Sequence, residues 1–148
     1  MKTKFLPLFF LVTMMFSCSS DDGGENNSTT QEQLIGKWMQ LSEKETANGT
    51  VVYDENWEHL CNSKKDYVEF YENGEFDWIQ YESSCEIDAE SSNQEATYSL
   101  SGNTLTFGGD GELNTVEIES ISATTLVVKT EETYQGVNYV YSTTLKKM

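Results

Sequence analysis

The chain of 148 residues carries 25 acidic residues against nine lysines and one histidine, which gives a formal charge of −16 at pH 7. Charge of this sign is repelled by the phosphates of nucleic acids and by anionic membrane surfaces, so the composition excludes nucleic-acid binding. A chain of this length makes one domain of ordinary size.

Residues 1–17 have the three parts of an export signal: the positive Lys2 and Lys4, an apolar run over residues 5–16, and the small residue Ser17. The apolar run is shorter than the roughly 20 residues that a helix needs to span a hydrocarbon core. We therefore expect residues 1–17 to be a cleaved signal peptide and not a membrane anchor.

Residues 15–18, Met-Phe-Ser-Cys, resemble the lipobox of bacterial lipoproteins, in which the cysteine becomes the lipidated first residue of the mature chain. Met15 stands where leucine is usual, and the alternative is an ordinary secretory signal followed by a coincidental cysteine. Residues 19–22, Ser-Ser-Asp-Asp, resemble the acidic tag that sends some Gram-negative lipoproteins to the cell surface. The resemblance implies an outer-membrane lipoprotein, exposed at the cell surface and held there by lipid on Cys18.

Residues 18–33 are mostly polar and acidic, so they bury little apolar surface and we expect a disordered tether. A flexible segment of this length has a reach of roughly 20 Å. At its end, Thr30 and Gln33 fit a capping box, with Thr30 as the N-cap, and predict one helical turn before Leu34.

Residues 34–148 have an all-β pattern, with no sustained helical periodicity. β-branched and aromatic residues cluster in short alternating runs that Gly, Asn and Ser separate. The runs number about eight and predict an up-and-down antiparallel barrel or a two-sheet sandwich.

The segment between Cys61 and Cys85 predicts a hairpin with a defined register. A three-residue loop over residues 72–74, with Gly74 in the left-handed region, gathers the apolar side chains on one face and most carboxylates on the other. The predicted pairs are Phe70 with Phe76 and Val68 with Trp78. A second hairpin, with Gly102-Asn103 as its turn, is predicted to pair Leu100 with Leu105 and Tyr98 with Phe107.

The first extended run, residues 38–43, opens with Gly36-Lys37-Trp38. A Gly-x-Trp at this place is similar to the lipocalins, where the tryptophan closes one end of the barrel. Residues 70–76 also resemble the Phe-x-x-Asp/Asn-Gly-x-Phe hairpin, bracketed by cysteines, of lipocalin-like lipoproteins of Gram-negative bacteria. The resemblance covers roughly residues 33–147. An eight-stranded lipocalin-like barrel is therefore favoured over the alternative, an immunoglobulin-like sandwich, whose disulfide usually joins more distant strands.

The three cysteines of this exported chain divide into one lipid carrier, Cys18, and one disulfide pair, Cys61 with Cys85. A bond that closes a loop of this size stabilises the fold by about 3 kcal/mol in the chain-entropy model. Cys61 as a nucleophile beside His59 would lack a third group to orient the pair. We therefore expect a structural bond.

These features favour a binding module for a small apolar ligand. The candidates for lining the ligand site are aromatic, and packing in a filled core is the alternative role of the same residues: Trp38, Phe70, Trp78, Tyr98 and Phe107. The alternative function is a protein or glycan accessory of the cell surface with a filled, non-binding barrel, whose contacts would be Tyr67, Tyr71, Tyr139 and Tyr141.

No reaction is indicated by the sequence, and we expect neither an enzyme nor a cofactor. A Ser-His-Asp order and a nucleophile elbow are missing. The single His59 has no second histidine or spare thiol with which to form a zinc site. The acidic run of Glu86, Asp88 and Glu90 lacks the spacing of a calcium loop, so we expect a solvated loop there.

Overall fold

The computed structural model describes residues 29–89, 91, 96–109 and 111–148. The predicted signal peptide, Cys18 and most of the predicted tether lie outside these residues. Within them, no helix has the length and apolar character that crossing a membrane would take. One short helix and nine strands follow each other in this order: α1 (Thr30–Leu34), β1 (Gly36–Ala47), β2 (Thr50–Asn56), β3 (Tyr67–Phe70), β4 (Phe76–Ile79), β5 (Thr97–Ser101), β6 (Thr104–Gly109), β7 (Glu112–Ile121), β8 (Thr125–Tyr134) and β9 (Val137–Lys147).

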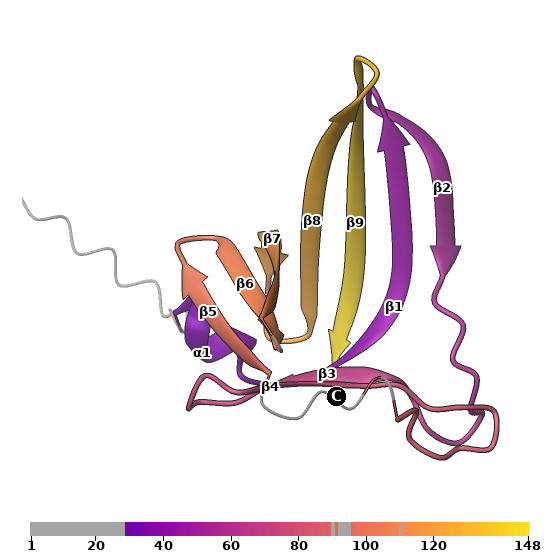
Figure 1. Ribbon diagram of the computed structural model, residues 1–148, viewed down its shortest axis with the longest axis vertical. Helices are drawn as coiled ribbons and strands as arrows, with labels where there is room; N and C mark the ends of the chain where they lie inside the picture. Colours follow the sequence, from indigo (N-terminus) through magenta and orange to yellow (C-terminus); the bar gives the residue numbers. More distant parts are fainter. Residues whose placement is uncertain (1–28, 90, 92–95, 110) are drawn as a thin grey trace, which may run out of the picture.

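All described strands belong to one antiparallel sheet that curls into a nearly closed barrel (Figure 1). Eight of them follow the order β4-β3-β1-β9-β8-β7-β6-β5, and β2 pairs with β1 outside this path. The gap is bridged where Glu75 pairs with Thr97, since the Phe76 N–H donates to the Ala96 carbonyl at 3.0 Å. A single curled sheet confirms the barrel and excludes the sandwich.

Both predicted hairpin registers are confirmed. Phe70 pairs with Phe76 and Val68 with Trp78, and Gly74 has the expected positive φ of 85°. In the second hairpin, Tyr98 pairs with Phe107 and Leu100 with Leu105. The alternation of apolar and polar residues decided both registers because a shift by one residue would have turned each apolar face to solvent.

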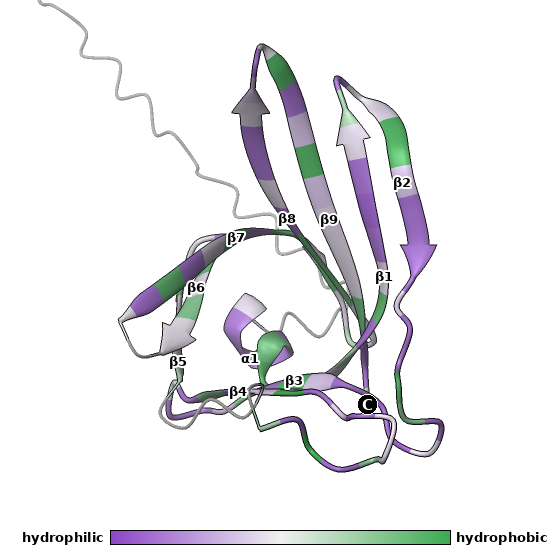
Figure 2. Ribbon diagram, turned by 45° about the vertical axis from the view of Figure 1, so that its right-hand side comes forward, coloured by the Kyte–Doolittle hydropathy of each residue, from purple (hydrophilic) through white to green (hydrophobic). Residues whose placement is uncertain are grey.

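The simple up-and-down order fails at β2. The sequence predicted that the first extended run ends at residue 43, but β1 continues to Ala47. The chain then turns through Asn48-Gly49, both with positive φ, into β2. One edge of β1 pairs with β9, and the two strands that follow β1 share the other edge. There, β3 pairs with residues 36–39 and β2 with residues 42–47. The β1–β2 and β8–β9 hairpins therefore extend beyond the ring of strands (Figure 2).

The predicted helical turn is present, but the predicted N-cap was wrong by one residue. Thr29 is the N-cap: its backbone N–H donates to the Glu32 carboxylate at 2.8 Å, and its hydroxyl accepts from the Glu32 N–H at 3.3 Å. A charged carboxylate is a stronger acceptor than the Gln33 amide and interacts favourably with the positive end of the helix, so the Thr29–Glu32 frame wins.

One end of the barrel is closed by α1 and the first residues of β1. Leu34 and Trp38 are both fully buried, and the indole N–H of Trp38 donates to the Leu34 carbonyl at 2.7 Å. From β9, the Lys147 ammonium lies 4.4 Å from the centre of a Trp38 ring and donates to the carbonyls of Gln33 and Ile35. Burial lowers the pKa of the Lys147 amine. The last strand thus fastens the closing helix.

We expect Lys147→Met to lower the free energy of unfolding by about 1 to 2 kcal/mol, because two carbonyls at the end of α1 lose their donor and the Trp38 ring loses its cation. Urea unfolding followed by tryptophan fluorescence measures this. Lys146→Met, at the exposed neighbouring position, is the matched control and should change little. Equal stability of the two variants would contradict a fastening role for Lys147.

Candidate functional site

A cavity of about 420 Å³ lies inside the barrel. This volume is in the range of pockets that hold small organic molecules. Most of the wall is apolar and comes from six different strands, with these side chains: Val68, Phe70, Phe76, Trp78, Leu105, Phe107, Val116, Leu126, Val128 and Leu145.

The wall becomes more polar with distance from the closed end. On β8 the inward positions read Leu126, Val128 and then Thr130, because successive inward residues of a strand are two apart. On β9, Leu145 is followed in the same direction by Thr143, its neighbour on the wall. The cavity therefore offers an apolar interior and a polar mouth.

β1 contributes to the closed end, the wall and the mouth. Trp38 is buried at the closed end, Gln40 lines the cavity, and Glu43 lines it nearer the extended hairpins. The Gln40 side-chain amide donates to Glu43 Oε1 at 2.9 Å. A bulge between Gln40 and Ser42 shifts the alternation by one residue, so Gln40 and Glu43 both face inward although they are three residues apart.

Three of the five predicted lining residues, Phe70, Trp78 and Phe107, lie on the cavity wall. Trp38 does not: it fills the closed end. Tyr98 is also packed away from the cavity, with 8% of its surface exposed, its ring edge-on to Phe70 at 5.0 Å and its hydroxyl donating to the Tyr71 carbonyl at 2.8 Å.

Most of the aliphatic wall and the whole polar mouth were not predicted from the sequence. The alternation in residues 126–130 was a usable signal for β8. Trp57, which lies beside β2 and lines the cavity, carried no such signal, because it stands in a loop whose course depends on distant contacts.

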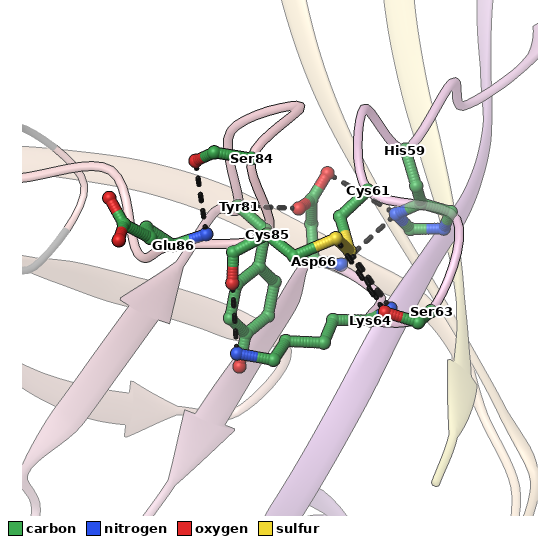
Figure 3. The surroundings of a disulfide bond; sticks show 9 residues. All are labelled: His59, Cys61, Ser63, Lys64, Asp66, Tyr81, Ser84, Cys85 and Glu86. Carbon is green, nitrogen blue, oxygen red and sulfur yellow. Dashed lines mark hydrogen bonds and ion pairs between the residues drawn. A yellow bond between two sulfur atoms is a disulfide. The ribbon is translucent and has the colours of Figure 1, made fainter.

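The predicted disulfide between Cys61 and Cys85 is confirmed, with 5.0 Å between the Cα atoms (Figure 3). It joins the loop after β2 to the turn after β4. Lys64 strengthens the junction, because its ammonium donates to the Cys85 carbonyl at 2.9 Å and lies 4.9 Å from the centre of the Tyr81 ring. The bond thus holds two loops together beside the barrel.

A buried carboxylate, Asp66, organises the same junction. Its Oδ1 accepts the Tyr81 backbone N–H at 2.9 Å, and its Oδ2 accepts the indole N–H of Trp57 at 2.9 Å. His59 lies in the loop after β2 with its side chain largely buried, and its Nδ1 can accept the Asp66 backbone N–H, whose nitrogen is 3.0 Å away. Asp66 therefore places the Trp57 ring at the cavity.

The tyrosines proposed as contacts for a partner do not form one surface. Tyr67 pairs with the beginning of β1 at Met39, whereas Tyr139 pairs with its end at Ala47. Tyr71 lies between two carboxylates, 2.8 Å from Glu69 and from Asp77, and burial together with these carboxylates raises the pKa of its hydroxyl. Only Tyr139 and Tyr141 stack, with ring centres 6.4 Å apart.

The model of a lipocalin-like domain family matches residues 34–128, which is more than half of the chain. The protein belongs to the lipocalin-like family. The matched part of this lipocalin-like chain includes Trp38, the disulfide and most of the cavity wall. Among curated proteins, none matches the chain significantly.

No metal site accompanies the lipocalin-like cavity: the described residues contain no group of three or more His, Cys, Asp or Glu side chains placed to hold an ion. Glu90 lies outside the described residues, so the solvated loop expected around Glu86, Asp88 and Glu90 stays a prediction.

We expect Asp66→Ala to lower the free energy of unfolding by about 3 kcal/mol, because it leaves the Tyr81 N–H and the Trp57 indole without their acceptor. Chemical denaturation gives the value. Asp54→Ala, an exposed carboxylate on β2, is the matched control and should stay within about 0.5 kcal/mol of the parent protein. A loss no larger than the control's would show that Asp66 does not hold the loop.

Proposed function

We propose that the protein is a non-catalytic binding module that carries a small, largely apolar ligand inside its barrel. The cavity of about 420 Å³, with its aromatic and aliphatic wall, is the observation that supports this function. Removing the apolar surface of a ligand from water contributes about 25 cal/mol per Å², which is offset in part by the entropy that the ligand loses on binding. The polar mouth would orient the ligand with its polar end outward.

We further propose that the module is an outer-membrane lipoprotein at the cell surface. The lipobox-like residues 15–18 and the polar residues that follow support this placement. Because the protein is strongly acidic, it would be repelled by an anionic surface, and its attachment would depend on the acyl chains of Cys18. The tether would hold the barrel clear of the membrane.

The cavity can be tested by filling it. We expect Val128→Trp to weaken binding of the neutral fluorescent probe N-phenyl-1-naphthylamine by about tenfold or more, because the indole would occupy the ligand's space. Fluorescence titration of the purified domain measures this. Val127→Trp is the matched control, since Val127 precedes it on β8 and does not line the cavity. Failure of the parent protein to bind the probe, or equal binding by both variants, would count against the function.

The attachment is tested separately. In the full chain, Cys18→Ser should abolish incorporation of radiolabelled palmitate and release the protein from the membrane fraction, because the cysteine thiol is the acceptor for lipid. A variant that changes only Ser19 to Ala should remain labelled. Unchanged labelling of Cys18→Ser would refute lipidation at this residue without affecting the proposal about the cavity.

A further inference from the structure

Among the described residues, Glu43 is the one ionisable side chain on the cavity wall. Its carboxylate accepts the neutral amide of Gln40 at 2.9 Å, and the ion pairs of the described residues do not include it. A carboxylate that is partly removed from water beside an apolar wall favours a positively charged partner. The described residues that line the cavity include no lysine or histidine that could be this partner.

Glu43 also lines two smaller hollows at the mouth. One, of about 270 Å³, continues along the extended hairpins past Glu45, Tyr53 and Tyr141. The other, of about 260 Å³, runs past Glu55, Glu58 and Trp57. The carboxylate therefore stands where the interior of the barrel meets both paths to its surface.

The mouth as a whole is negative. Besides Glu43, three carboxylates line these hollows, Glu45, Glu55 and Glu58, and Lys44 is the basic residue among their described lining. Partial desolvation and then the charges of Glu55 and Glu43 raise the pKa of the Tyr53 hydroxyl, which is the direction that a negative field gives. A concave surface of one sign concentrates ions of the opposite sign at its entrance.

Aromatic faces accompany these carboxylates. Trp57 lines both the cavity and one hollow, and its indole N–H is already bonded to Asp66, so the ring is held in place. Tyr53 lines both hollows. Electron-rich rings beside a carboxylate are the surroundings that ammonium and guanidinium groups prefer.

From this arrangement we propose that the ligand is an amphiphilic cation, with its apolar body inside the barrel and its ammonium or guanidinium group at Glu43. The inference rests on the proposed binding function and specifies its ligand class. A fatty-acid-like ligand of the same length would bring a second carboxylate to Glu43 through a negative mouth, so anionic amphiphiles are disfavoured.

Three ligands that share an eight-carbon chain separate the two proposals: 1-octanol, octylamine and octanoate, each titrated at pH 7 and low salt against bound N-phenyl-1-naphthylamine. We expect octylamine to bind most tightly, octanol less tightly and octanoate least tightly. The dissociation constants of the amine and the acid should differ by about tenfold or more. Added salt should reduce this ratio because it screens the mouth.

Two variants complete the test. Glu43→Gln, which retains an acceptor for Gln40, should weaken the binding of octylamine about tenfold and change the affinity for octanol by no more than about twofold. Glu119→Gln removes the same charge from an exposed site on β7 that lines neither the cavity nor the hollows, and should leave the order unchanged. Thermal unfolding checks that both variants remain folded.

If octanol binds while octylamine binds no tighter than octanoate, or if Glu43→Gln leaves the preference intact, the cationic ligand class is refuted and the binding function stands. If none of the three ligands nor the probe binds, the binding function itself fails. These outcomes keep the two proposals apart.

Discussion

The hydrogen-bonded pairing of β1 with its neighbours is the constraint on which the rest of the structure depends. One edge of β1 pairs with β9 and so joins the beginning of the described chain to its end. The other edge pairs with β3 and then with β2. Because antiparallel ladders fix side-chain direction, these pairings determine which residues of β1 face inward.

The inward residues of β1 lie at three successive levels of the barrel: the closed end, the cavity wall and the mouth. Trp38 is buried at the closed end, Gln40 lies on the wall, and Glu43 stands at the mouth. The bulge near Leu41 is essential to this order, since without it residue 42 and not Glu43 would continue the inward series after Gln40. A local irregularity of one residue thus places the only charge on the described wall.

The disulfide and Asp66 hold the loop that follows β2, and their effect reaches the cavity through Trp57. A cross-link that closes a loop of this size contributes on the order of 3 kcal/mol by restricting the unfolded chain. Asp66 acts differently: it satisfies donors on both sides of the junction while it is itself 5% exposed. Together they give the loop the rigidity that a fixed aromatic wall requires.

Local pattern was sufficient to predict the parts of the fold that depend on neighbouring residues. Phe70 and Phe76 found their register from a turn and an alternation that lie within the same few residues. β2 was missed although Asn48-Gly49 is a strong hairpin signal. The reason is that the seven residues of β2 are all exposed and show no apolar alternation that would mark a buried face. Trp38 and Tyr98 could not be separated from the lining aromatics, because all are inward residues and only their level in the barrel distinguishes core from wall.

The level at which each inward residue lies in the barrel also explains how a small barrel keeps an open interior. The rings of Phe70, Phe76 and Phe107 form a chain with centres 5.1 to 5.2 Å apart, and such contacts between rings stabilise the wall itself. Leu34 and Trp38 fill the end beside α1, and the core continues from there through Leu126 and Leu145. Farther from that end the inward residues of β7, β8 and β9 are shorter, as at Val116, Val128 and Thr143. Core packing and a cavity therefore coexist because the bulk of the inward side chains decreases along the barrel.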